Sequence, residues 1–413
     1  MKRVVRIGVA LVLVGLLLPT AVAGIERVVG ETKSVDSRES KTVENGGTAL
    51  ISYQGGNAFA KGGGVIALDR SSNEVIWSHT AHRKYYDVDP VSDDRILITA
   101  AERSSDQWYA FIIDWRTNET ISRFPVPVDT HDVDKIGKDQ FAVADKAADR
   151  AYVYNTSTSS ITWEYNFTQD YTPADGGPYE TDWTHLNDID LVSNGSHFLL
   201  SPRNFDRVML VNRSTQEITW ELGEQGNYST LFGQHDPVII NSNPMTVLIG
   251  DSRNHRAVEY QYRDGSWDQT WVHYGNLRWP RDVDRLPSGN TIITDTGNDR
   301  VVEITPEGDV VWEYTTEGER GFAAPYDVEI LRHGDEPRGP AMTDTVDERP
   351  DPNSLRHQYR NTIFYLANSA NFVLPGWINF REFRFLLAAG GVAGVWITSE
   401  MVLYGVRLYR RRV

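Results

Sequence analysis

His131-Asp132-Val133-Asp134 is the stretch that decides the fold, because variants of it recur along the chain. The six copies are Tyr86-Asp87-Val88-Asp89, His131-Asp132-Val133-Asp134, Asn187-Asp188-Ile189-Asp190, His235-Asp236-Pro237-Val238, Arg281-Asp282-Val283-Asp284 and Tyr326-Asp327-Val328-Glu329. Their first aspartates are spaced 45, 56, 48, 46 and 45 residues apart. A repeat of this length with strand-like alternation is typical of a β-propeller.

The segments between these copies read as β-strands. Short β-branched or aromatic runs such as Arg95–Thr99 and Asn290–Thr294 follow the motif, and an alternating strand comes next. A tryptophan closes most units, at Trp163, Trp220, Trp271 and Trp312. Each repeat therefore supplies about four strands, and we predict an all-β, six-bladed propeller over residues 48–335.

The two ends of the repeat region predict how the ring closes. Only one clear strand follows Tyr326, whereas three precede Asp87, near residues 49–53, 64–69 and 74–78. We expect these three strands to complete the blade that contains Asp327. Such closure removes the exposed strand edges that invite aggregation.

Composition excludes several classes of protein. The 413 residues include no cysteine, which excludes a disulfide scaffold, a zinc-thiolate protein and a thiol enzyme. With 57 acidic against 41 basic side chains the net charge is −16, so a general nucleic-acid binder is excluded as well. Only 8 of the basic residues are lysine, and an acidic, lysine-poor chain of this kind suits a halophilic, haloarchaeal-like origin.

The flanking segments predict attachment to a membrane. Residues 1–24 have the layout of a signal peptide or signal anchor, and residues 25–47 and 336–361 read as linkers. Residues 362–384 form a membrane-proximal apolar segment, and Phe385–Val406 is long and apolar enough to be a transmembrane helix. The basic tail, 407–413, is expected in the cytoplasm, which places the propeller on the extracellular side of the cell membrane.

Three histidines stand at or just before the repeated motif in consecutive units, namely His131, His185 and His235. The starts of innermost strands lie near a propeller axis, so the three imidazoles should converge on one end of the central channel. Arg203, in Ser201-Pro202-Arg203-Asn204, adds a guanidinium, and Asp251-Ser252-Arg253-Asn254 repeats that arrangement one unit later.

Three kinds of site fit these residues. Neutral histidines could hold Zn²⁺ or another transition metal. The ring of aspartates could hold Ca²⁺ through oxygen ligands. Histidine and arginine together could form an oxyanion site with one neutral imidazole as nucleophile.

Around these residues the sequence resembles the arylsulfotransferase family. The resemblance covers about residues 80–315. It rests on Trp183-Thr-His185-Leu-Asn187, Asn194-Gly195, Ser201-Pro-Arg203, Ile218-Thr-Trp220-Glu-Leu-Gly223 and Phe232-Gly-Gln234-His235-Asp236. It implies a six-bladed propeller that transfers a sulfuryl group from a phenolic sulfate ester to another phenol. It further implies His235 as the transiently sulfated nucleophile, with His185, Arg203 and His131 binding the sulfuryl oxygens.

The predicted partners are thus a small-molecule aryl sulfate, a phenol and, through the C-terminal helix, a membrane; no nucleic acid, cofactor or metal is expected. The alternative is a non-enzymatic, membrane-anchored propeller with NHL-like repeats that serves as a binding or scaffold module.

Overall fold

The computed structural model describes residues 12–13, 17, 42–43, 46–55, 62–103, 105–315, 322–334, 339–342, 345–346 and 380–410. Two compact units divide the chain, a propeller unit (38–55 and 61–354) and a second unit (1–37, 56–60 and 355–413). The predicted signal segment lies almost wholly outside the described residues, as do most of the predicted linker 25–47 and residues 347–379.

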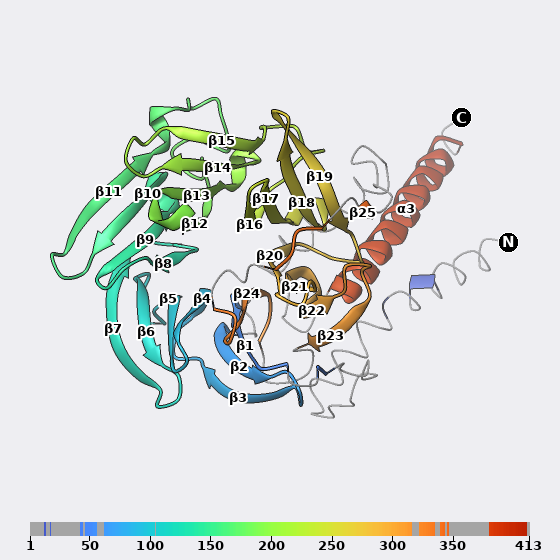
Figure 1. Ribbon diagram of the computed structural model, residues 1–413. Helices are drawn as coiled ribbons and strands as arrows, with labels where there is room; N and C mark the ends of the chain where they lie inside the picture. The colour runs from blue at the N-terminus through green and yellow to red at the C-terminus, as the bar shows by residue number, and fades with distance from the viewer. Residues whose placement is uncertain are drawn as a thin grey trace. The chain divides into compact units, whose positions relative to one another are not determined.

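Six antiparallel sheets form the blades of the propeller around a central channel (Figure 1). Blade 1 holds β4 (Lys84–Ser92), β5 (Arg95–Ala101), β6 (Trp108–Asp114) and β7 (Glu119–Val126). Blade 2 holds β8 (Val133–Lys135), β9 (Gln140–Asp145), β10 (Arg150–Asn155) and β11 (Ser160–Asn166). Blade 3 holds β12 (Leu186–Val192), β13 (His197–Pro202), β14 (Arg207–Asn212) and β15 (Ile218–Gly223).

Blade 4 holds β16 (His235–Ser242), β17 (Met245–Asp251), β18 (Arg256–Arg263) and β19 (Ser266–His273), with β25 (Thr345–Val346) at its edge. Blade 5 holds β20 (Pro280–Arg285), β21 (Thr291–Asp295), β22 (Arg300–Ile304) and β23 (Val310–Thr315). Blade 6 holds β24 (Pro325–Ile330), β1 (Thr48–Tyr53), β2 (Gly64–Asp69) and β3 (Glu74–His79). Short 3₁₀ turns are η1 (Lys146–Ala148), η2 (Phe167–Gln169), η3 (Ser193–Gly195), η4 (Arg203–Phe205), η5 (Ser252–Asn254) and η6 (Thr296–Asn298).

Ring closure occurs as the sequence predicts. β1 pairs antiparallel with β24, with Leu50 opposite Glu329 and Ile51 opposite Val328. The N-terminal strands thus complete the blade that contains Asp327, and the prediction of a six-bladed, all-β propeller is confirmed.

The first aspartate of the motif joins neighbouring blades around the axis. Its carboxylate accepts a hydrogen bond from the next blade. The donor is the backbone N–H of the residue that follows the first aspartate of that blade. The observed bonds are Val133 N to Asp87 (3.2 Å), Ile189 N to Asp132 (2.5 Å), Val328 N to Asp282 (2.9 Å) and Val88 N to Asp327 (2.7 Å). Blade 4 departs from this pattern, because its residue at the donor position is Pro237, which has no N–H.

Apolar side chains fill the space between adjacent blades. One cluster between blades 5 and 6 contains Ile51, Val328 and Trp312, all at or near 0% exposure. The tryptophan that closes a repeat also bonds to the next blade: Trp163 Nε1 donates to Arg213 O (2.8 Å) and Trp312 Nε1 to Asn73 Oδ1 (2.8 Å). The position of a residue within its repeat thus determines whether it packs in the core and which bond it makes to the next blade.

Part of the predicted linker 336–361 packs on the propeller. β25 pairs in parallel with β19, and Met342 is buried between blades 4 and 5. The Met342 N–H donates to Glu259, whose carboxylate forms a fully buried ion pair with Arg285 (3.2 Å). The sequence does not predict this strand, because two residues carry no periodic signal.

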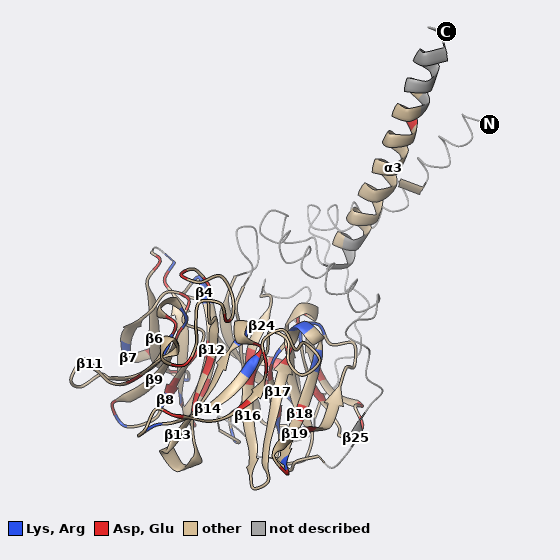
Figure 2. Cartoon of the chain, turned by 90° about the horizontal axis from the view of Figure 1, so that it is seen from above, with Lys and Arg blue, Asp and Glu red and all other residues tan. Residues whose placement is uncertain are grey.

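The helix of the second unit, α3 (Phe380–Arg410), is longer than the predicted span Phe385–Val406. It takes in the end of the predicted membrane-proximal segment and the start of the predicted basic tail. Its segment Phe385–Val402 is long and apolar enough to cross a membrane. Glu400 is the one charged residue of this segment, and Figure 2 shows the described part of the helix mostly in the colour of uncharged residues.

Because Ile51 is fully buried in the strand that closes the ring, Ile51→Ala should destabilise the protein by about 2 to 5 kcal/mol, as other large-to-small core substitutions do. Urea unfolding measures this cost, and amide hydrogen exchange should quicken in β24. Ile121→Ala, at a residue 43% exposed on blade 1, is the control and should cost about 0.5 kcal/mol or less. Equal costs for the two variants would contradict the closure.

Candidate functional site

A left-handed backbone turn leads the chain into the innermost strand of most blades. The residue three positions before the first aspartate of the motif has a positive φ in these blades. These residues are Asp129 (62°), His185 (46°), Gly233 (58°), Trp279 (51°) and Ala324 (58°). The turn brings the next residues to one end of the channel, which we call the mouth. His185 thus lies two residues before the register of His131 and His235, where Asn187 takes the equivalent place.

Six side chains immediately before the first aspartates form a ring at the mouth. These ring residues are Tyr86, His131, Asn187, His235, Arg281 and Tyr326. His131 Nδ1 lies 3.0 Å from Asn187 Oδ1 and 2.9 Å from the Tyr326 hydroxyl. The Arg281 guanidinium lies over the Tyr326 ring at 4.3 Å. Sequence analysis singled out only the histidines, although the shared register identifies all six.

The hydrogen bonds of Ser252 define the tautomer of His235. The Ser252 hydroxyl donates its one proton to Pro280 O (2.6 Å), so it accepts from the Nδ1–H of His235 (2.8 Å). A neutral His235 therefore carries its lone pair on Nε2. No hydrogen-bond partner for Nε2 occurs among the residues that the structure describes. This is the nitrogen that a nucleophilic imidazole needs.

His185 is oriented by a carboxylate. Its Nδ1 lies 2.6 Å from Asp182 Oδ1, and its ring meets the His131 ring edge-on at 5.1 Å. Since Nδ1–H donates to Asp182, the neutral ring presents Nε2 as a proton acceptor. This pairing of imidazole and carboxylate is the arrangement that makes a histidine a competent general base.

His131 has protein groups beside both of its ring nitrogens. Besides the bonds of Nδ1, its Nε2 lies 3.7 Å from Asp129 Oδ2, and the Tyr86 ring packs against it at 4.3 Å. Both nitrogens thus face protein groups. His131 orders the ring and is placed less well than His235 to contact a ligand directly.

Arg203 lies at the same mouth. Its Nη2 is 3.7 Å from Asp182 Oδ2, and its side chain is 14% exposed. The expected equivalence of Arg203 with Arg253 is wrong, because the left-handed residues that end η4 and η5 are Asp206 and His255. Arg203 and Ser252 each lie three residues before these left-handed residues, so Arg203 is equivalent to Ser252.

The same count aligns Arg203 with Lys146, the first residue of η1, whose ammonium bonds to Asp129 and lies 3.9 Å from Asp182. Lys146 and Arg281 are cations of the mouth that sequence analysis missed. In both cases the alignment of the repeats carries the signal: Arg281 occupies the ring register, and Lys146 occupies the turn position of Arg203.

Burial and nearby cations keep all three histidines neutral. Burial lowers the pKa of His131 to about 4, although Asp129 opposes the shift. The pKa of His185 falls well below its ordinary value, first through burial and then through the charge of Arg203. Burial lowers the pKa of His235 in the same way, and Arg281 and Arg203 add to the effect.

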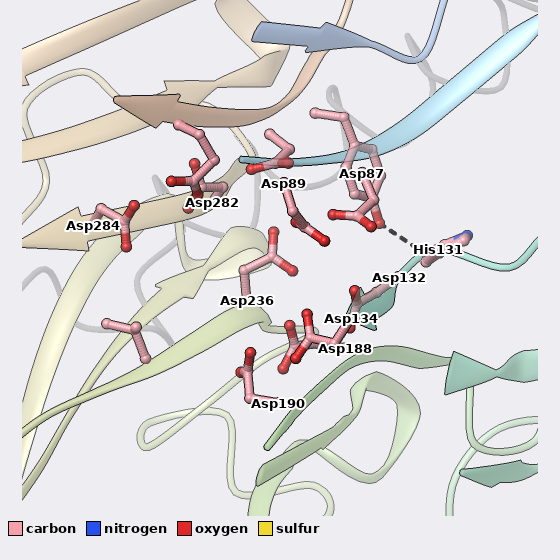
Figure 3. A pocket seen from close by; sticks show the side chains of 14 residues that line it. Asp87, Asp89, His131, Asp132, Asp134, Asp188, Asp190, Asp236, Asp282 and Asp284 are labelled. Carbon is pink, nitrogen blue, oxygen red and sulfur yellow. Dashed lines mark hydrogen bonds between the residues drawn. The ribbon is translucent and has the colours of Figure 1, made fainter. Parts of the chain in front are cut away.

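Below the ring residues, the channel is lined by carboxylates (Figure 3). Asp87, Asp132, Asp188, Asp282 and their partners point toward one another, and the space between them is a narrow cavity of about 40 Å³. Burial raises the pKa of Asp132 and Asp282 well above the usual value, and neighbouring carboxylates add to this. The channel is therefore acidic inside and cationic at its mouth.

This arrangement supports a metal site of aspartates and a metal site of histidines to different degrees. Within the described part of the chain, oxygens of Asp87, Asp89 and Asp327 lie within 4.8 Å of one another, whereas the three histidines form no such group. Asp87 and Asp327 are also the carboxylates that accept N–H groups of the next blade, which is a structural role. Two of the three carboxylates of the acid cluster are thus accounted for by the fold.

A sequence model described as "Arylsulfotransferase (ASST)" matches residues 137–236. This span includes His185, Arg203 and His235 but only part of the propeller. No curated protein matches the chain.

Among solved structures, a protein of unknown function from Bacteroides caccae is 16% identical, with a TM-score of 0.47, covering 67% of this chain and 97% of that one. A putative 6-phosphogluconolactonase from Bacteroides fragilis is 8% identical, with a TM-score of 0.46, covering 72% of this chain and 99% of that one. A virginiamycin B lyase from Staphylococcus aureus is 12% identical, with a TM-score of 0.37, covering 56% of this chain and 69% of that one. Similarity at this level carries no argument about activity.

Ser252→Ala should allow His235 to adopt both neutral tautomers, because it removes the hydrogen-bond acceptor of Nδ1–H. Nitrogen NMR of histidine-labelled protein should show a protonated Nδ1 and an unprotonated Nε2 in the wild type, and a mixture in the variant. Ser266→Ala, at an exposed serine of the same blade, is the control. A wild-type protein protonated at Nε2 would contradict the assignment.

Asp236→Asn should stabilise the protein at neutral pH. Burial raises the pKa of Asp236 to about 7, and its Oδ2 has no hydrogen-bond partner among the described residues. Folding therefore takes up a proton between the ordinary value near ~4 and pH 7, so wild-type stability falls as pH rises through this window.

The gain in melting temperature for Asp236→Asn should accordingly appear above pH 4 and level off above pH 7. Asp264→Asn is the control, since Asp264 shares a positive φ but is exposed. A loss of stability in Asp236→Asn at pH 8 would refute the proposed burial cost.

Proposed function

We propose that the protein is an arylsulfotransferase-like enzyme that moves a sulfuryl group from a phenolic sulfate ester to a phenol through a sulfated His235. The observation that carries the proposal is the Nε2 of a neutral, buried His235, which has no hydrogen-bond partner among the described residues and lies near the charges of Arg203 and Arg281. The family match over residues 137–236 supports the same class of reaction. The six-bladed fold by itself is compatible with this activity and with a scaffold.

In the first half-reaction, His235 Nε2 attacks the sulfur of the ester. The nitrogen–sulfur bond forms as the bond from sulfur to the phenolic oxygen breaks, and the phenolate leaves and takes a proton from water. Nδ1 keeps its proton throughout, and the Ser252 oxygen stabilises the positive charge that develops on the ring. No external oxidant, reductant or nucleotide enters the balance.

Cations at the mouth would stabilise the transition state. As in phosphoryl transfer, negative charge spreads over three equatorial oxygens while the group is between donor and acceptor. Arg203 and Arg281 are the cations whose charges act on His235, and Lys146 stands at the turn position equivalent to Arg203. The carboxylates of Asp129 and Asp182 hold Lys146 in place without meeting His235.

In the second half-reaction, the acceptor phenol attacks the sulfur of sulfated His235. His185 Nε2 is the base that removes the phenolic proton, and Asp182 stabilises the imidazolium that results. The new oxygen–sulfur bond forms as the nitrogen–sulfur bond breaks, and His185 returns its proton to water. The low pKa of His185 suits this role, since the resting base must be unprotonated.

We also infer that α3 anchors the chain in the cell membrane with the propeller on the extracellular side. The apolar segment Phe385–Val402 supports the anchor. Arg407 and Arg410–Arg412 follow this segment, and basic residues next to a membrane span favour the cytoplasmic side.

Mixing the purified full-length protein with an aryl sulfate should add the mass of one SO₃ group, as read by intact-mass spectrometry. His235→Ala should abolish the adduct, and His197→Ala, at a partly exposed histidine of blade 3, should leave it unchanged. Arg203→Ala should slow adduct formation by about 10²- to 10³-fold, as loss of one oxyanion donor does.

Arg213→Ala is the matched control for the arginine, because Arg213 lies over the Phe198 ring on the outer part of blade 3. A folded wild-type protein that forms no adduct with any aryl sulfate would favour the NHL-like scaffold instead. An adduct that survives in His235→Ala would remove His235 from the mechanism.

A further inference from the structure

Carboxylates from all six blades line the narrow cavity below the ring residues. Eleven of its fourteen lining residues are aspartate or glutamate, and lysine and arginine do not occur among the described residues that line it. The cavity measures about 40 Å³, whereas one water molecule needs about 10 to 15 Å³, so there is room for a cation and a bound water. Because buried charges in proteins are paired or bind a metal, this much enclosed negative charge favours a cation.

One side of the cavity has the geometry of a calcium site. Oxygens of Asp87, Asp89 and Asp327, the acid cluster, lie within 4.8 Å of one another, and all three residues are buried. Calcium takes oxygen ligands at about 2.3 to 2.6 Å, so oxygens that bind one ion are at most about 5 Å apart. Asp87 and Asp327 each accept a backbone N–H as well. This bond leaves coordination possible, because the two oxygens of a carboxylate offer about four lone-pair sites.

Asp236 enters the same cavity from blade 4, which stands across the ring from blade 1. Its Oδ2 is buried and has no hydrogen-bond partner among the described residues. Among the first aspartates of the motif, Asp236 alone has a left-handed backbone (φ 38°). Figure 3 shows its side chain pointing into the cavity among the carboxylates of the other blades. Since buried polar atoms are normally satisfied, this oxygen indicates a ligand inside the cavity.

Blade 4 also brings its carboxylate to the channel without the backbone donor that accompanies it in other blades. The donors near the axis are N–H groups that follow the first aspartate, namely those of Val88, Val133, Ile189 and Val328. Pro237 follows Asp236 and has no N–H. Blade 4 thus adds negative charge to the channel without this donor, and a bound cation would supply a positive partner inside the cavity.

We propose that this cavity binds one calcium ion through the acid cluster on one side and Asp236, directly or through a water, on the other. Calcium accepts six to eight oxygen ligands in a flexible geometry, whereas magnesium demands a nearly ideal octahedron. A shell built from carboxylates that the fold already holds in place therefore suits calcium better. The site uses none of the residues assigned to sulfuryl transfer and goes beyond that function.

Calorimetric titration of the full-length protein with CaCl₂, after removal of bound metal with EDTA, measures the binding. A background of about 1 M KCl, where the Debye length is about 3 Å, screens weak binding to the acidic surface. One ion should bind per chain. Asp236→Asn should bind it at least about tenfold more weakly, because the charge of the ligands sets the affinity for calcium. Asp264→Asn, at an exposed aspartate of the same blade, is the matched control and should bind calcium as the wild type does.

Thermal unfolding gives a second reading that a misfolded variant could not imitate. In EDTA, Asp236→Asn should melt above the wild type at neutral pH, because it removes the buried carboxylate. Added calcium should raise the melting temperature of the wild type and of Asp264→Asn by more than that of Asp236→Asn, since a ligand stabilises the folded state according to its affinity.

Two results would overturn the calcium site. One is the absence of stoichiometric binding to the wild type, and the other is equal affinity in the wild type and Asp236→Asn, which would assign the binding to surface carboxylates. The proposed function fails separately. A protein that binds calcium in this way but forms no sulfated adduct would support the site and contradict the enzyme, whereas an adduct without calcium binding would do the reverse.

Discussion

The ring of blades is held together near its axis by a hydrogen bond from a backbone N–H of one blade to the buried aspartate of the preceding blade. It recurs around the axis, including the bond from Val88 to Asp327 that joins the last blade to the first. A typical intramolecular hydrogen bond stabilises a fold by about 0.5 to 1.5 kcal/mol. Repeated around a ring, it fixes the rotation of each inner strand and hence the direction in which the preceding residue points.

Blade 4 breaks this pattern at the position where the chemistry is proposed. Pro237 removes the donor, and the neighbouring Asp236 has a buried oxygen without a hydrogen-bond partner in the described part of the chain. His235 stands immediately before it, held by Ser252 and not by the ring residues that hold His131. Real proteins break their local rules at functional sites, and the irregular blade carries the histidine whose Nε2 has no hydrogen-bond partner in the described part of the chain.

Charge along the channel favours neutral imidazoles for two reasons. The carboxylates lie below the ring, where burial raises the pKa of Asp132 and Asp282, while Arg203, Arg281 and Lys146 lie close to the histidines. Burial disfavours the imidazolium, and the adjacent cations disfavour it further. An anion entering the mouth therefore meets fixed positive charge that belongs to arginine and lysine, and the histidines remain available as nucleophile and base.

Sequence repeats predicted most of this architecture, because a period near 46 residues and the β-alternation within it are global features. Closure by residues 48–79 followed from counting strands at the two ends. The site was predicted only in part: His131, His185, His235 and Arg203 were identified, but Lys146, Arg281, Asp182 and Ser252 were not. Their roles depend on left-handed turns and on the offset between η4 and η5, which spacing alone does not reveal. β25 was missed because a two-residue strand depends on tertiary contacts.

The pH dependence of the first half-reaction tests whether His235 is the neutral nucleophile. Rapid mixing of the full-length protein with excess chromogenic aryl sulfate, without acceptor, gives the rate of the phenolate burst. Protonation of His235 stops the attack, and its pKa is lowered by burial and by Arg281 and Arg203. The burst rate should therefore stay constant from pH 8 to below 6 and decline only at lower pH. A rate that halves near pH 6.5, the ordinary histidine value of about 6.5, or at any higher pH would contradict a site built to keep this imidazole neutral.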